Sequence, residues 1–338
     1  MPKVRPAAVD AERQGHGRTL AGRRRRLARV VRAKPPSGLV RAVPVQAPRD
    51  AATGGCGDAK DMIRSIRPGQ LLLAAALALF GAQYLIEASP PAGAAAADFY
   101  RLHQLVPIGR PPGAVLCWVV GIALIVAALL IAASRAAPWA AAVTGAALVL
   151  DSAIAYLPGI VMKPSSPLTG CFELLAIGGG AWMLAAALAQ GPGTVPNGPR
   201  STVATVAGMA GMAGAAGMAR LGVAGRVLLV ISLLVFGFDH FRFATFVASL
   251  VPAWLPGHMF WTILFGVAFI AAAASFATRV QERLAGTLLG AMFMIWFLTL
   301  HLPRSFAAPT NGNEWTSAFV ALALWGCSWI VAGTARQA

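Results

Sequence analysis

Most ionisable side chains in the last third of the chain lie in four short segments that interrupt apolar sequence. The segments are FGFDHFRF (236–243), VPAWLPGH (251–258), LHLPR (300–304) and NGNEWT (311–316). Imidazoles and carboxylates in apolar surroundings can exchange protons, bind metal ions or hydrogen-bond the polar end of a small molecule. The candidate binding residues, none of which is assigned a catalytic role, are Asp239, His240, Arg242, His258, His301, Arg304 and Glu314.

One interpretation of these residues is a metal site. His240, His258 and His301 offer nitrogen ligands, and Asp239 or Glu314 offers an oxygen ligand. Their spacing matches no known metal-binding motif, so a metal is less favoured than an organic ligand.

A second interpretation is a pocket for a quinone or another small molecule. The His and Arg side chains would hydrogen-bond a carbonyl oxygen, and an Asp or Glu would carry the proton. The aromatic residues expected to flank the ring are Trp254, Phe260, Trp261 and Trp315.

A third interpretation is purely structural. Asp239 would pair with Arg242 and Glu314 with Arg304, while the histidines cap helix ends and the Trp residues lie in an interfacial belt.

The elements that must position these residues are apolar helices. The chain is 57% hydrophobic and 12% charged, with a mean hydropathy of +0.67, which is more apolar surface than a 338-residue soluble domain can bury. Runs of about twenty residues are long enough to cross a bilayer. The sequence therefore predicts an all-α, polytopic membrane protein with eight spans, at about 69–88, 114–134, 137–157, 170–190, 227–245, 258–278, 284–302 and 315–333.

Two segments are predicted to lie outside the spans. Residues 1–66 form a basic tail that we expect to be disordered, and 14 of the 28 Lys and Arg residues precede Met62. This tail is typical of a polybasic segment on anionic lipid, and no nucleic-acid partner is expected. Alternatively, translation starts at Met62. Residues 191–225, rich in Gly, Ala and Pro, are predicted to be a cytoplasmic linker, with a further weak helix as the alternative.

The second four spans repeat the first four. Leu105-Val106-Pro107 recurs 145 residues later as Leu250-Val251-Pro252, and Phe80-Gly81 recurs as Phe236-Gly237 at a larger offset. Because each repeat has an even number of spans, we expect two parallel four-helix bundles, 67–190 and 226–338. The ionisable groups are concentrated in the second copy, where Asp239 and His240 replace Gln83 and Tyr84, His301 replaces Tyr156, and Glu314 aligns with Thr169.

The arginine distribution predicts the orientation of the spans. Basic residues near the ends of spans favour the cytoplasm, which places the N-terminus inside and the four polar segments on the outer face of a bacterial inner membrane. Asp151 is an acid within the third span, interpreted either as a hydrogen-bonded neutral group or as a proton-carrying site. Cys117 and Cys171 lie near the outer face, where they are either packed thiols or a disulfide.

The runs LLVFGFDHFRF and VPAWLPGHMFWTILFG resemble the DoxX family of four-helix membrane proteins. The resemblance is best over 227–333 and weaker over 69–190. It marks Phe236, Asp239, His240, Phe241 and Val251-Pro252 as family-like positions, and assigns no catalyst.

The resemblance implies a quinone-linked or redox-associated membrane subunit, with a quinone or a redox partner protein as its partner in the lipid bilayer. The alternatives are a non-catalytic membrane scaffold and a small-molecule or proton-coupled transporter, so the sequence does not decide whether the protein is an enzyme.

Overall fold

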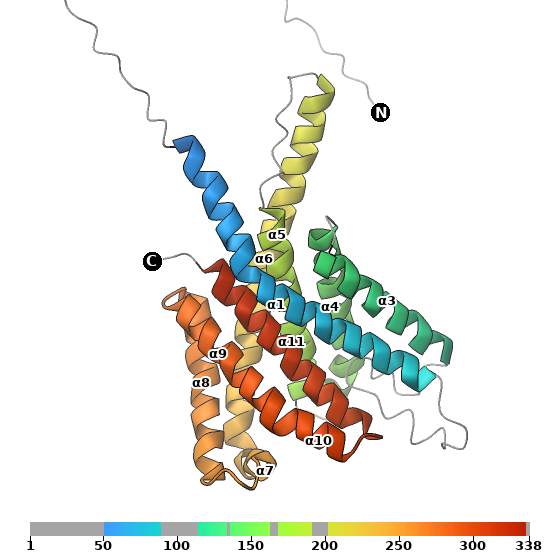
Figure 1. The fold of residues 1–338 in the computed structure, drawn as a ribbon, viewed down its shortest axis with the longest axis vertical. Helices are drawn as coiled ribbons and strands as arrows, with labels where there is room; N and C mark the ends of the chain where they lie inside the picture. The colour runs from blue at the N-terminus through green and yellow to red at the C-terminus, as the bar shows by residue number, and fades with distance from the viewer. Residues whose placement is uncertain (1–50, 89–113, 134–135, 163–167, 191–201, 336–338) are drawn as a thin grey trace, which may run out of the picture. The chain divides into compact units, whose positions relative to one another are not determined.

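The computed structural model describes residues 51–88, 114–133, 136–162, 168–190 and 202–335, and every regular element among them is helical (Figure 1). The long helices are α1 (Ala51–Ala88), α3 (Ala114–Ala133), α4 (Ala137–Met162), α5 (Thr169–Ala189), α6 (Thr202–Arg242), α8 (His258–Thr278), α9 (Glu282–Trp296) and α11 (Gly312–Thr334). Shorter pieces are α7 (Ala244–Leu250), a π-helical turn (Phe297–His301) and α10 (Leu302–Ala307).

The prediction of eight long apolar helices is confirmed. Within the described ranges, eight stretches are long and apolar enough to cross a membrane. They are Asp61–Ile86, Val115–Ala133, Ala137–Ile154, Thr169–Ala189, Gly214–Arg242, His258–Thr278, Glu282–Ala307 and Gly312–Thr334.

Two predicted boundaries require correction. Helix α6 begins at Thr202, so residues 202–225 are helical and continuous with the fifth span instead of forming a linker. Helix α1 begins at Ala51, so residues 51–66 are helical although the tail was predicted to reach residue 66. The glycines in residues 202–225 weaken the helix propensity of this stretch, and it is helical as an extension of the fifth span, which packs against α5 and α8. The predictions for residues 1–50 and 191–201 lie outside the described residues.

The helices pack in an order that differs from their order in the chain. Helix α1 packs against α3 and against α11, the last helix, while α5 packs against α4 and α6. Helix α6 packs against α8, α9 against α11, and α5 also contacts α11. Figure 1 shows α11 running alongside α1, although the two are far apart in sequence. Each set of four helices therefore shares long helix–helix contacts with the other set.

Glycines allow the closest of these contacts, and the same contact occurs twice. A Cβ at Gly69 in α1 would lie 2.6 Å from the carbonyl oxygen of Gly326 in α11. Gly225 in α6 meets Gly179 in α5 in the same way. Small residues let helix backbones approach closely, as is common between membrane helices. The contact between α1 and α11 is thus matched by the contact between α6 and α5.

The same correspondence holds within each set of four helices. Gly81 of α1 packs against Gly121 of α3, and Gly237 of α6 packs against Gly266 of α8. The first helices correspond at an offset of 156 residues and the second helices at 145, as the sequence repeat predicts. Gly69 of α1 corresponds to Gly225 of α6 at the offset of 156. Their partners, Gly326 of α11 and Gly179 of α5, therefore also correspond, which sets the offset of the fourth helices at 147.

Candidate functional site

A cavity of about 580 Å³ lies where one end of α6 meets the neighbouring helices. We call it the His240–His301 cavity. Its wall is formed by residues from α5, α6, α7, α8, α9, the π-helical turn and α11. The volume lies within the range of small-molecule binding sites.

Two carboxylates and two imidazoles line the cavity. They are Asp239, His240 and His301 from the second set of helices and Glu173 from α5. Asp239 is 9% exposed and accepts a hydrogen bond of 2.8 Å from the hydroxyl of Thr169, which also lines the cavity. Among the described residues, no Lys or Arg lines this cavity. These groups can therefore exchange protons and hydrogen-bond a ligand, without a fixed positive charge.

His240 is oriented by its own helix. Its Nδ1 lies 2.7 Å from the carbonyl oxygen of Phe236, one turn earlier in α6. A carbonyl oxygen only accepts, so Nδ1 carries the proton, and Nε2 of the neutral ring can accept a hydrogen bond. The imidazole also packs edge-on against Phe269, with ring centroids 5.1 Å apart.

His301 occupies the last position of the π-helical turn Phe297–His301. Such turns are rare and occur frequently at functional sites, because the extra residue per turn changes the direction of the side chains that follow. In the corresponding part of the first half, α4 continues as an α-helix through Tyr156 to Met162. The widened turn therefore occurs in the helix of the second half and not in α4, its counterpart.

The remaining wall is largely apolar and aromatic. Phe236 and Phe293 both pack against Phe269, each with ring centroids 5.8 Å apart, and Phe265 packs against Trp296 at 5.0 Å. All five of these rings line the cavity. The predicted aromatic residues lie elsewhere: Trp254, Phe260, Trp261 and Trp315 are outside the lining.

Four of the seven predicted binding residues do not line the cavity. Arg242 is exposed and lies over the ring of Phe243, 5.4 Å from its centroid. His258 begins α8. Arg304 donates two hydrogen bonds to Glu314, of 2.9 and 2.7 Å, so these two residues form the ion pair that the structural interpretation predicts. Asp239 does not follow that interpretation, since its partner is Thr169.

The other sequence candidates are also outside the cavity. Asp151 is half-buried in α4 and does not line it. Cys117, Cys171 and Cys327 are buried and form no disulfide within the described residues, and the Cys171 sulfur lies 3.1 Å from the hydroxyl of Ser152. Within the described ranges, no three His, Cys, Asp or Glu side chains are grouped closely enough to hold a metal ion.

Thr169 and Glu173 are contributions to the cavity that the sequence interpretation missed. Both come from α5, a helix of the first set, which packs against α6 through the contact between Gly179 and Gly225. The glycine run 178–180 is the sequence signal that could have indicated this contact.

The polar contact between Asp239 and Thr169 has a counterpart between α1 and α11. The Gln83 amide lies 3.3 Å from the hydroxyl of Thr316, and these residues correspond to Asp239 and Thr169 at offsets of 156 and 147. Thr316, not Glu314, therefore corresponds to Thr169. The contact is polar in both places, but only the one between Asp239 and Thr169 includes a charged residue.

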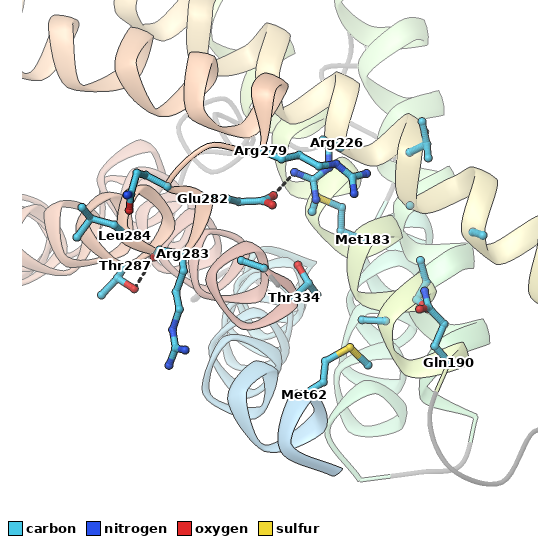
Figure 2. A pocket seen from close by; sticks show the side chains of 17 residues that line it. Met62, Met183, Gln190, Arg226, Arg279, Glu282, Arg283, Leu284, Thr287 and Thr334 are labelled. Carbon is cyan, nitrogen blue, oxygen red and sulfur yellow. Dashed lines mark hydrogen bonds and ion pairs between the residues drawn. The ribbon is translucent and has the colours of Figure 1, made fainter. Parts of the chain in front are cut away.

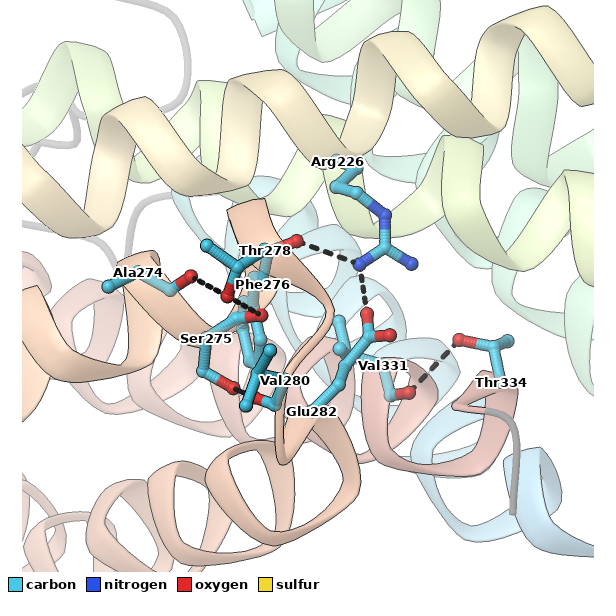
Figure 3. Close-up of polar contacts among 9 residues, drawn as sticks. All are labelled: Arg226, Ala274, Ser275, Phe276, Thr278, Val280, Glu282, Val331 and Thr334. Atoms are coloured by element: carbon cyan, nitrogen blue, oxygen red, sulfur yellow. Dashed lines mark hydrogen bonds and ion pairs between the residues drawn. The ribbon is translucent and has the colours of Figure 1, made fainter. Parts of the chain in front are cut away.

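A second cavity, of about 1040 Å³, lies at the opposite ends of the same helices (Figure 2). We call it the Arg226–Glu282 cavity. Arg226 of α6 forms an ion pair with Glu282 of α9 and donates a hydrogen bond of 3.1 Å to the carbonyl oxygen of Phe276 (Figure 3). The two side chains of this pair are 16% and 7% exposed.

This contact also has an uncharged counterpart. Gln70 of α1 donates to the carbonyl oxygen of Ile131 in α3, and these positions correspond to Arg226 and Phe276 at offsets of 156 and 145. Ala137 occupies the position that corresponds to Glu282. At both ends of its helices, the second half therefore carries charged residues where the first half has uncharged ones.

Comparison with known proteins gives one family match. Residues 229–324 match a domain of unknown function, DUF8561. The matched segment contains most of the His240–His301 cavity but not Thr169 or Glu173. No curated protein and no solved structure matches this chain.

Proposed function

We propose that this chain is a multi-pass membrane protein that binds a quinone, or a ligand of similar shape and polarity, in the His240–His301 cavity. The placement in a membrane is supported by the eight apolar helices and by their outward-facing side chains. On α3, for example, Val115, Val119 and Ile122 are at least half exposed. A helix that exposes such side chains along its length fits a hydrocarbon environment.

The proposed topology has the N-terminus in the cytoplasm of a bacterial cell and the His240–His301 cavity near the outer face. The distribution of arginines near helix ends supports this orientation. The glycine contacts that occur twice support two parallel four-helix repeats, each resembling a DoxX-like unit. The cavity at their contact is where ligands commonly bind in repeated membrane folds.

The cavity itself carries the proposal for a ligand. Apolar side chains, seven of them Phe or Trp, form most of the wall, and two imidazoles and two carboxylates also line it, which suits a flat apolar ring with oxygen atoms at its edge. His240 Nε2 would accept a hydrogen bond from a hydroxyl of the reduced form, or donate to a carbonyl oxygen when the ring is protonated. Asp239 and Glu173 would receive or supply protons. Electrons would be exchanged with a separate redox partner protein.

Quinone binding can be measured in detergent or nanodiscs by quenching of tryptophan fluorescence. Trp296 lines the cavity, so Trp296→Phe should remove most of the quenching that a short-chain quinone analogue produces. We expect His240→Ala and His301→Ala each to weaken binding by about three- to tenfold, the effect of losing one net hydrogen bond.

His258→Ala is the matched control, because it removes an imidazole near the same helix ends but outside the cavity. It should leave the dissociation constant unchanged. Equal affinities for all three histidine variants would contradict the proposal and favour a scaffold without a ligand.

A further inference from the structure

We propose that the Arg226–Glu282 cavity binds a phosphate-bearing anion, whose most direct source in a bilayer is the headgroup of an anionic phospholipid. This site relies on the membrane placement proposed above but not on quinone binding, because it lies at the other ends of the helices.

The charge of the lining is the first argument. Among the described residues, three arginines line the cavity, Arg226, Arg279 and Arg283, and Glu282 is the one acid in the lining. Glu282 is paired with Arg226, whereas Arg279 and Arg283 are exposed and form no ion pair within the described residues. Two positively charged side chains in the lining are therefore left without an acidic partner among the described residues. Figure 2 shows both arginines with the Arg226–Glu282 pair.

The comparison between the two halves is the second argument. Gln70 makes the same contact to a helix carbonyl as Arg226 does, and it needs no acid as a partner. The packing of α6 against α8 consequently does not explain why an arginine and a buried glutamate are present. A paired arginine keeps donors for a ligand, because a guanidinium has five N–H groups. Arginine also matches the geometry of phosphate oxygens.

The backbone between α8 and α9 is the third argument. Arg279 and Gln281 have φ values of +61° and +54°, and among the described residues they are the only non-glycine residues with positive φ. Glycine is preferred at such positions, and the exceptions cluster at ligand sites. Both residues line the cavity, so these two disfavoured backbone positions lie in its wall.

The rest of the lining fits a lipid. Met62 of α1, Met183 of α5 and Leu284 of α9 contribute apolar surface beside the arginines. A headgroup held by Arg279 and Arg283 would leave its acyl chains against this surface. Basic pockets between membrane helices bind anionic headgroups in this manner.

Binding can be measured by native mass spectrometry of the full-length protein in detergent, titrated with phosphatidylglycerol or phosphatidylcholine. We expect phosphatidylglycerol to bind more tightly, and Arg279→Gln and Arg283→Gln each to weaken it by about fivefold. Arg220→Gln is the matched control, since Arg220 is an exposed arginine of α6 outside the cavity. Arg279→Gly removes the same charge while relieving the backbone, so a loss of binding in this variant would not reflect unfolding.

Inorganic phosphate distinguishes the two sources of the anion. If phosphate binds with the same dependence on Arg279 and Arg283 while phosphatidylglycerol does not, the ligand is a soluble phosphate compound. If both arginine variants bind phosphatidylglycerol as the wild type does, or if neither probe binds, the proposal is wrong. Quinone quenching measured on the same variants should be unchanged, which separates this result from a failure of the quinone site.

Discussion

Replacing Arg226 by glutamine tests whether the buried ion pair between Arg226 and Glu282 stabilises the fold, or whether an uncharged side chain at position 226 serves equally well. The substitution keeps a donor for the carbonyl oxygen of Phe276, as Gln70 shows at the corresponding position. It removes the partner of Glu282, whose side chain is only 7% exposed. Breaking a buried pair by removing one partner typically costs about 3–5 kcal/mol, because the other charge is left unpaired.

The double variant Arg226→Gln, Glu282→Ala should recover most of this loss. It recreates the arrangement of the first half, in which Gln70 and Ala137 occupy these positions without any charge. Replacing both partners of a buried pair is often neutral, so we expect a free energy of unfolding within about 1 kcal/mol of the wild type.

The measurement is unfolding by sodium dodecyl sulfate in mixed micelles, followed by tryptophan fluorescence, on the wild type, both single variants and the double variant. Glu282→Ala alone should also destabilise, since it leaves Arg226 without its acid. A double variant as unstable as Arg226→Gln would refute the reasoning that an unpaired carboxylate causes the loss. A neutral Arg226→Gln would show that water reaches Glu282 and that its burial does not matter.

Two further predictions concern helix packing and the hydrogen bond between Thr169 and Asp239. Gly69→Ala should lower the free energy of unfolding by about 1–3 kcal/mol, because the new Cβ would lie 2.6 Å from the carbonyl oxygen of Gly326. Gly217→Ala is the control in the same assay. Its Cβ would have no atom within 4 Å, so this variant should be neutral or slightly stabilising. Thr169→Val removes the 2.8 Å hydrogen bond to Asp239 and should destabilise by about 1–3 kcal/mol, with weaker quinone quenching; an unchanged unfolding midpoint would show that water replaces the hydroxyl.

Much of the fold could be predicted because long apolar helices appear in the sequence as long runs of hydrophobic residues. The eight spans follow from hydrophobic runs of sufficient length. The repeat follows from Val-Pro pairs that recur at a fixed spacing, such as Val106-Pro107 and Val251-Pro252. The extent of α6 was harder to predict. A stretch with glycines at 208, 211, 214 and 217 has weak helix propensity, and it becomes helical as an extension of a well-packed helix.

The site could be predicted only in part, because sequence position does not show which helices meet. Asp239, His240 and His301 were identified as polar residues near helix ends, and they do line one cavity. Arg304 and Glu314 looked equally suitable, but they satisfy each other in an ion pair. Thr169 and Glu173 were missed because the packing of α5 against α6 depends on backbone approach at glycines, which a search for reactive side chains does not detect. The π-helical turn that carries His301 left no recognised signal in the sequence.

The contribution of α5 to the His240–His301 cavity has a consequence for how such a chain can evolve. A symmetrical pair of separate four-helix subunits would build two identical sites, and every substitution would alter both. Here one polypeptide holds two unequal halves, so Glu173 from the first half and the imidazoles of His240 and His301 from the second line the same cavity. Joining the halves therefore permits a mixed set of donors and acceptors around a single cavity. The corresponding contact between Gln83 and Thr316 can remain uncharged.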